Sequence, residues 1–140
     1  MECTRVDLTL GFRHLSEHAP ESWTPAALAP AAYDAAALDR HGAALIDWRE
    51  RYRARLAASG VDEARRQARM QAVNPVYIPR NWLAQEAIDA AEQGDLAPLQ
   101  TLYDVLRQPY VHQSGRSHHA GKRPDWARHR PGCSMLSCSS

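Results

Sequence analysis

Apolar side chains recur at helical spacing over most of the first 107 residues. Leu45, Trp48, Tyr52 and Leu56 follow one another at intervals of three or four, which places them on one face of a helix over residues 38–58. Further helices are predicted over residues 5–16, 61–73, 80–93 and 95–107. Short connections make the last two an antiparallel hairpin. The pattern therefore predicts a mainly α protein.

Proline and glycine separate these predicted helices. Residues 18–37 are rich in Pro and Ala and predict a surface connection with at most one short helical turn. Gly60 supplies a left-handed cap at the end of the helix over residues 38–58. In the helix that follows, we expect a face of small residues to allow close approach of a neighbour. That face consists of Val61, Ala64, Ala68 and Ala72.

The sequence changes character after residue 110. From Val111 onward Gly, Ser, His, Arg and Pro dominate, and no period is sustained. We expect a helical region over residues 1–110 and an irregular or disordered tail over residues 111–140. Asp125 and Trp126 are the candidate anchor of that tail.

Composition and charge limit the function classes. Hydrophobic residues make up 44% of the chain, but many are Ala and one is Phe, which predicts a thin core. A net charge of +1 gives no reason to expect nucleic acid or an acidic membrane as partner. No apolar run approaches the roughly 20 residues of a membrane span. Three cysteines make no disulfide framework and no signal peptide is apparent, so we expect a cytoplasmic protein.

A corner bounded by two prolines is the most distinctive stretch. Pro75 excludes Asn74 from helical geometry, so the preceding helix ends there. Pro79 has a backbone suited to the first turn of a new helix. Between the two prolines, residues 76–78 form a bulky apolar plug. The corner holds several polar side chains and an aromatic ring close together.

The corner and the segments after it occur in the order of a known family. The motifs are Asn74-Pro75-x-Tyr77-x-x-Arg80-Asn81-x-Leu83-Ala84-Gln85-x-Ala87-Ile88, Ala91-Glu92-x-Gly94-Asp95, Pro109-Tyr110, Pro124-Asp125-Trp126-Ala127 and Ser137-Cys138-Ser139-Ser140. In this order they resemble the C-terminal part of the selenoprotein O family, bacterial members included, of protein adenylyltransferases with a kinase-like (pseudokinase) fold. The structural signature is Asn74, Pro75, Tyr77, Arg80, Asn81 and Gln85.

The resemblance implies an enzyme whose chemistry lies outside these residues. Family members transfer AMP from ATP, with Mg²⁺, to Ser, Thr or Tyr hydroxyls of protein substrates. This chain has no glycine-rich phosphate loop, no β3-type lysine and no Asp-Phe-Gly. No catalytic, cofactor-binding or metal residue is therefore assigned here, and the chain alone is predicted to be inactive. The expected partner is an upstream kinase-like body, on which this C-terminal segment packs.

Cys138 is the one residue for which the resemblance implies chemistry. Selenocysteine members of the family carry that residue third from the C-terminus, where Cys138 stands, and the family is described as redox-regulated. A thiol on a mobile tail could reach a distant cysteine and form a disulfide with it reversibly. Cys133 is a candidate second cysteine, although the upstream body is the preferred source of a partner. The competing interpretation is an inert terminal cysteine.

Two other sets of polar residues have simpler interpretations. The zinc-type candidates are His112, His118, His119, His129, Cys133 and Cys138. Their spacing matches no standard ligand pattern, and we favour a solvated basic tail. Arg80, Asn81 and Gln85 could contact the body or a substrate. We favour a local role, in which Asn74 and Asn81 satisfy backbone groups at the two helix ends and Arg80 pairs with a carboxylate.

A different class of function also fits the pattern. The apolar stripe that includes Leu45, Trp48 and Tyr52, together with the hairpin over residues 80–106, could dock a partner. The alternative is therefore a stand-alone helical protein-interaction module without catalytic activity.

Overall fold

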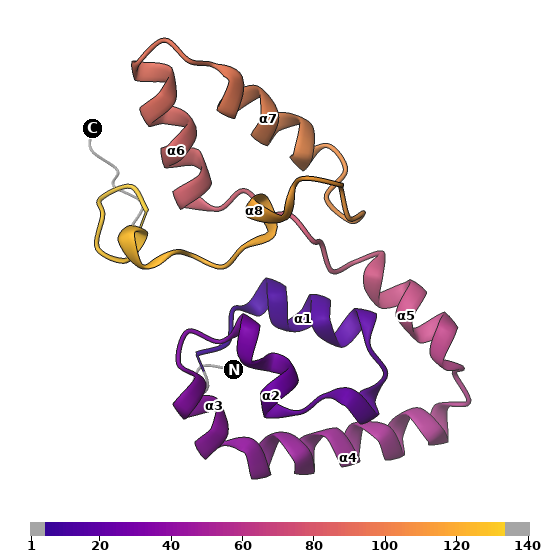
Figure 1. The fold of residues 1–140 in the computed structure, drawn as a ribbon. Coiled ribbons are helices and arrows are strands. Elements are labelled where there is room, and N and C mark those ends of the chain that lie inside the picture. Colours follow the sequence, from indigo (N-terminus) through magenta and orange to yellow (C-terminus); the bar gives the residue numbers. More distant parts are fainter. Residues whose placement is uncertain (1–4, 134–140) are drawn as a thin grey trace. The chain divides into compact units, whose positions relative to one another are not determined.

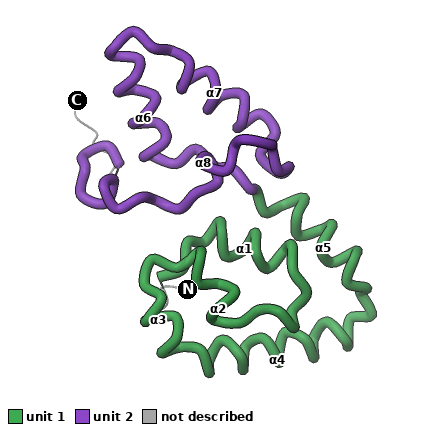
Figure 2. The backbone as a smooth tube through the Cα atoms, in the orientation of Figure 1, with its two compact units in different colours: residues 1–75 green, residues 76–140 purple. Residues whose placement is uncertain are grey.

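The computed structural model describes residues 5–133, and these residues are mainly helical, as predicted (Figure 1). Within this range there is no β-strand, and extended pairing is limited to an isolated antiparallel bridge between Val6 and Ala32. The chain divides into two compact units, Met1–Pro75 and Val76–Ser140 (Figure 2). The boundary expected at residue 110 separates a helical region from an irregular tail, which is a different kind of division, and it stays a prediction. The observed division falls at the corner because separate apolar clusters form on either side of it.

Short capped helices build the first unit. Its elements are α1 (Leu8–Glu17), η1 (Pro20–Ser22), α2 (Pro25–Leu28), η2 (Ala29–Ala31), α3 (Ala35–Arg40), α4 (Gly42–Ser59) and α5 (Glu63–Gln71). Four of these helices begin at a side-chain oxygen that accepts a backbone N–H three residues ahead. These caps are Asp7, Thr24, Asp34 and Asp62. The Pro/Ala-rich connection thus contains more helical turns than the one we expected.

The helix expected over residues 38–58 is broken in two. α3 ends at Arg40, His41 leaves helical geometry, and α4 starts at Gly42. Gly42 is buried, and a Cβ there would lie 3.0 Å from Cγ of Pro25. The break therefore lies where the backbone approaches a proline that is distant in sequence, which periodicity does not reveal.

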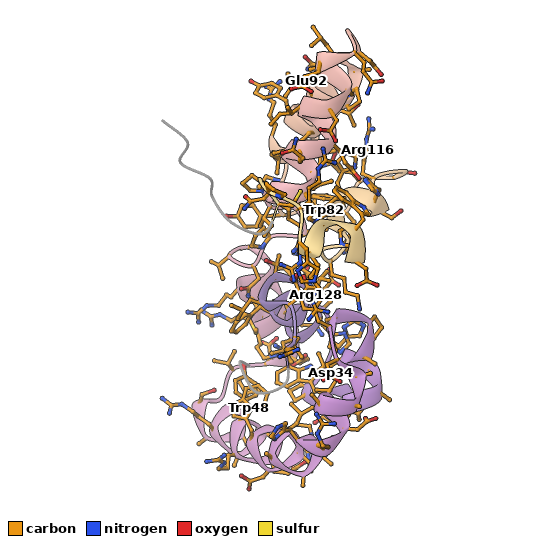
Figure 3. All side chains as sticks on the ribbon, turned by 90° about the vertical axis from the view of Figure 1, so that its left-hand side faces the viewer. Asp34, Trp48, Trp82, Glu92, Arg116 and Arg128 are labelled. Carbon is orange, nitrogen blue, oxygen red and sulfur yellow. The ribbon has the colours of Figure 1, made fainter. Side chains whose placement is uncertain are left out.

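The core of the first unit has an aliphatic part and an aromatic part. The aliphatic cluster contains Val6, Leu28, Ala31, Ala32 and Leu38. In the aromatic part, Trp23 is fully buried, and Trp48 and Tyr52 of α4 pack on it with ring centroids 5.7 and 5.1 Å away. Trp48 extends from α4 in Figure 3. The predicted stripe of α4 thus faces the core.

The buried face of α5 differs from the expected one. Ala64, Ala68 and Ala72 are exposed, and Arg66 is buried instead. The prediction of a small-residue face is wrong. The helix turns Arg66 toward α1 because the carbonyl groups at the end of α1 need donors, which alanine cannot supply.

A helical hairpin forms the second unit. Its elements are α6 (Asn81–Glu92), α7 (Ala97–Leu106), α8 (Ser117–Ala120) and η3 (Asp125–Arg128). α6 and α7 lie side by side (Figure 1), close to the predicted bounds, with Gly94 in the left-handed region at φ 86°. One core cluster contains Trp82, Leu83, Ala87, Leu102, Ala127 and Cys133. A second contains Val76, Tyr77 and Val105.

Residues 111–133, which we call the strap, add to both clusters. Ala127 is fully buried and Cys133 is 6% exposed in the first cluster, and Ala120 packs against the second. The strap is irregular apart from α8 and η3, but its described part is packed rather than free. Its anchor is Ala127, whereas the ring of the expected anchor Trp126 is 46% exposed. Within residues 5–133, no helix has the length and apolarity that a membrane crossing needs.

Candidate functional site

The corner predicted as a signature spans the division between the two units. Asn74 ends the first unit: its side-chain amide donates to Ser16 Oγ (3.0 Å) and to the carbonyl oxygen of Met70 (2.9 Å). Its own carbonyl oxygen accepts from the buried guanidinium of Arg13 at 3.0 Å. Asn74 therefore satisfies backbone and side-chain groups where α5 ends, which agrees with the local role that we favoured.

Tyr77 fixes the corner within the second unit. Its ring is 2% exposed, and its hydroxyl oxygen accepts the backbone N–H of Gln113 at 2.9 Å. The backbone N–H groups of Val76 and Tyr77 both donate to the carbonyl oxygen of Pro109, at 2.8 and 3.1 Å. Gln113 in turn donates from its side chain to the carbonyl oxygens of Val105 (2.9 Å) and Gln108 (3.1 Å). The corner thus ties the end of α7 to the start of the strap.

Gln85 is another signature residue that meets the strap. Arg80 is the half-buried N-cap of α6, and Asn81 is its exposed first residue. Gln85 lies one turn further on, and its side chain donates to Asp89 Oδ1 at 2.9 Å. The side-chain amide oxygen of Gln85 lies close to Gly132. A Cβ added at Gly132 would be 2.4 Å from that oxygen.

An ion pair joins the strap to α6 beside Gln85. Arg130 donates to Asp89 Oδ1 at 2.7 Å, and both side chains are partly exposed. The hydrogen bond from Gln85, and then that from Arg130, lower the pKa of the Asp89 carboxyl below its ordinary value. Arg130 also lies over the ring of Trp126, 5.7 Å from its centroid. These contacts hold the segment that leads to Cys133.

A histidine pair of α8 lies on the first turn of α6. His118 Nε2 lies 2.8 Å from Glu86 Oε2, and its ring meets the ring of Trp82 edge-on at 5.0 Å. Burial, and then the charges of His118 and Arg116, lower the pKa of His119. Nδ1 of His119 and Nε1 of Trp82 are buried without a hydrogen-bond partner. Figure 3 labels Trp82 and Arg116 in this region.

The cysteines and the zinc-type candidates do not form a reactive cluster in the described part. Cys133 is buried among apolar side chains and is not in a disulfide. Cys138 lies outside the described residues, so its redox role stays a prediction. Among residues 5–133, no three His, Cys, Asp or Glu side chains gather as a metal site. No chemical step is assigned to these side chains here.

A shallow hollow in the first unit has no clear chemistry. It has a volume of about 340 Å³ between η1, the end of α4 and the start of α5. Arg53 and Glu21 at its rim form an ion pair of 2.9 Å, and Arg53 is also paired with Glu50. Its charged groups satisfy one another, so the hollow offers no free charge that would select a ligand.

Arg66 is the residue that sequence reasoning missed. Its guanidinium donates to the carbonyl oxygens of Leu15 and His18, both at 2.9 Å, and to both oxygens of Glu63 at 2.6 and 2.7 Å. It also lies over the ring of Trp23, 5.4 Å from the centroid. The signal that could have found it is its place opposite the alanines of α5, at i+3 from Glu63.

The described features are helix packing and polar ties between segments, and they form no catalytic cluster within residues 5–133. The family model for protein adenylyltransferase SelO matches residues 1–107. Proteins named protein nucleotidyltransferase YdiU are similar to this chain. The one from Tolumonas auensis is 50% identical to it, and those from Xanthomonas euvesicatoria pv. vesicatoria and Azoarcus sp. are 49% identical to it. Each match covers all 140 residues of this chain and 27% of the relative. The chain belongs to the protein adenylyltransferase SelO family.

Proposed function

We propose that this chain is a helical packing segment of a protein adenylyltransferase. The observation that carries the proposal is the identity of 47–50% to protein nucleotidyltransferases over all 140 residues. The chain spans 27% of the length of these relatives, so most of the enzyme that we propose is not represented here. The order of the motifs around the corner supports the proposal that this segment belongs to the C-terminal part of a kinase-like fold.

The reaction proposed for the whole enzyme is transfer of AMP to protein. A Ser, Thr or Tyr hydroxyl oxygen of a substrate protein attacks the α-phosphorus of ATP and loses its proton. The bond between that phosphorus and the oxygen bridging to the β-phosphate breaks, and pyrophosphate leaves. ATP and Mg²⁺ would be held by the remainder of the enzyme, because the motifs that bind them are missing from this sequence. The contribution of this chain is to packing.

The proposal extends to a redox role for Cys138. Two thiols, that of Cys138 and one from the remainder of the enzyme, would lose two electrons and two protons to a peroxide, which is reduced to water or an alcohol. The burial of Cys133 argues against that residue as the ready partner, because its thiol is enclosed by Trp82, Leu83 and Ala127. Treatment with hydrogen peroxide followed by mass spectrometry should yield a disulfide that includes Cys138 in the whole enzyme. An unmodified Cys138 thiol would contradict this role.

The adenylyltransferase proposal is tested by joining this chain to the part of the Tolumonas auensis protein that it does not match. The chain takes the place of the matching 27%, and ATP labelled on the α-phosphate is supplied with Mg²⁺. We expect label on protein with the joined polypeptide and none with the 140-residue chain alone. Transfer by the chain alone would contradict its assignment as a packing segment. A folded joined polypeptide that transfers nothing, next to an active intact relative, would contradict the shared activity.

The alternative, a stand-alone interaction module, is favoured by one observation. The large apolar residues Leu96, Leu99 and Tyr103 are exposed on α7, as a protein-docking surface would be. If the chain is a stand-alone module, we expect the isolated chain to unfold cooperatively and to bind a separate protein. The activity of the joined polypeptide should then not depend on this chain. Thermal unfolding of the isolated chain, set beside the activity of the joined polypeptide, distinguishes the two.

A further inference from the structure

Helix α7 has more apolar surface than its own unit covers. Leu102 and Val105 are buried in the two clusters of the second unit, and Leu106 packs against both. Three further apolar side chains remain exposed, at fractions of 61%, 50% and 59%. These are Leu96, Leu99 and Tyr103, which we call the α7 stripe.

The spacing of these residues makes the α7 stripe continuous. Positions 96, 99 and 103 recur at intervals of three and four, so the side chains follow one another along one side of the helix. Together with the buried residues they give α7 an apolar arc of about half its circumference at 100° per residue. A surface helix that packs on one neighbour needs an arc nearer 100°. The width of the arc therefore indicates a second covering surface.

The described part of the strap does not supply that cover. Ala127 and Cys133 pack in the cluster of Trp82 and Leu102, and Ala120 packs in the cluster of Val76 and Tyr77. Arg107 lies over the ring of Tyr103 at 5.9 Å, yet that residue keeps more than half of its surface exposed. Within the described part of the second unit, residues 76–133, the α7 stripe is open.

We infer that the α7 stripe is the docking surface for the remainder of the adenylyltransferase polypeptide, an inference that rests on the proposed function. The relatives indicate the occupant: this chain matches 27% of their length, so most of their length is available to cover the stripe. A covering segment within the same polypeptide needs no second molecule. Burial of three large apolar side chains is the kind of contact that holds one part of a fold against another.

Charge indicates the chemistry of the covering surface. Residues 81–106 carry acidic side chains and no Lys or Arg; the acidic residues are Glu86, Asp89, Glu92, Asp95 and Asp104. Glu86 and Asp89 are paired with the strap. Asp95 directly precedes the α7 stripe, and Asp104 directly follows Tyr103. Arg107, over the ring of Tyr103, is the cation at the other end of the stripe, so we expect the covering surface to have an apolar centre with Lys or Arg opposite Asp95.

The test compares one double variant, Leu99→Lys with Tyr103→Lys, in two settings. In the 140-residue chain both side chains are exposed, and we expect the midpoint of thermal unfolding to stay within about 2 °C of the unchanged chain. In the polypeptide joined to the unmatched part of the Tolumonas auensis protein, the same lysines would be buried without partners. There we expect the midpoint to fall by roughly 5 °C or more.

A matched control uses the polar side of the same helix. Ala97→Lys adds the same side chain at an exposed position on the side of α7 away from the α7 stripe, and it should change neither midpoint by more than about 2 °C. A double variant that leaves the joined polypeptide unchanged overturns the inference. So does one that lowers both midpoints equally, because the stripe would then pack within the chain itself. A dimer of the isolated chain that the double variant converts to monomer in sedimentation assigns the stripe to a second copy, which also overturns it.

Activity separates this inference from the proposed function. A joined polypeptide that transfers AMP but tolerates the double variant contradicts only the docking surface. One that loses thermal stability with the double variant but never transfers AMP contradicts only the proposed activity.

Discussion

The guanidinium of Arg66 donates a hydrogen bond of 2.9 Å to the carbonyl oxygen of His18, the C-cap residue of α1. Another nitrogen of the same group donates to the carbonyl oxygen of Leu15 at 2.9 Å. Carbonyl groups at the end of a helix have no partner within it, and a positive charge there is favourable for the helix dipole. α5 therefore supplies hydrogen-bond donors to the carbonyl groups at the end of α1, although Arg66 and His18 are 48 residues apart in the sequence.

Replacing Arg66 should destabilise the first unit. Arg66→Leu removes both bonds to the end of α1 and leaves Glu63 without its cation and with Gln67 as a donor, which we expect to cost roughly 2–4 kcal/mol of unfolding free energy. Urea denaturation followed by circular dichroism measures the loss. Arg65→Leu is the matched control on the same helix, because that side chain is exposed, and it should stay within about 0.5 kcal/mol of the unchanged chain. Equal effects of the two substitutions would contradict the assigned role.

Glu63 should make the first unit sensitive to acid. Hydrogen bonds from Arg66 lower the pKa of the Glu63 carboxyl below its ordinary value of 4.5. Because the pKa is lower in the folded state, the carboxylate stabilises the fold above pH 4.5, and this stabilisation is lost as pH falls through the folded pKa. We expect Glu63→Gln to be less stable at pH 7 and to lose less stability between pH 4.5 and pH 3 than the unchanged chain. Urea denaturation at these pH values measures it, and identical acid dependence would contradict the argument.

Tyr77 should hold the strap through its hydroxyl group. Tyr77→Phe leaves the ring buried but removes the acceptor for the backbone N–H of Gln113, 2.9 Å away. We expect a loss of about 1 kcal/mol and faster hydrogen exchange of the Gln113 amide. Tyr103→Phe, at an exposed ring, is the control and should change neither quantity. Unchanged exchange at Gln113 would show that the bond does not restrain the strap.

Local pattern was sufficient for some elements and not for others. The hairpin of α6 and α7 was predicted within a few residues because its apolar period is regular and Gly94 ends the first helix. The break at Gly42 was missed because it depends on contact with Pro25, which is distant in sequence. Arg66 was missed because a buried cation depends on which carbonyl groups face it. Such tertiary contacts leave little trace in spacing.

The candidate site was predictable to a similar degree. The local role that we favoured for Asn74 is confirmed by its bonds to Ser16 and Met70. The packing of the strap was not predicted. Its contacts with α6 are isolated residue pairs such as Arg130 with Asp89, and such pairs produce no periodic pattern in the sequence. The redox role of Cys138 and the kinase-like fold stay predictions, since they concern residues that the structure does not describe or that lie outside this chain.

Gly132 should control access to the Cys133 thiol. A Cβ at Gly132 would lie 2.4 Å from Gln85 Oε1, and the backbone there has φ 82°, which L side chains rarely adopt. Gly132→Ala should therefore displace the Gln85 amide from its hydrogen bond to Asp89 and strain this part of the strap, which makes Cys133, now 6% exposed, easier to reach. In a background with Cys3→Ser and Cys138→Ser, we expect a thiol reagent to label Cys133 at least roughly tenfold faster, since local opening would become easier by more than about 1.4 kcal/mol. Gly115→Ala is the matched control, because φ is 72° there but no atom lies within 4 Å of the added Cβ. Equal labelling rates in the two variants would mean that the contact with Gln85 does not keep the strap closed.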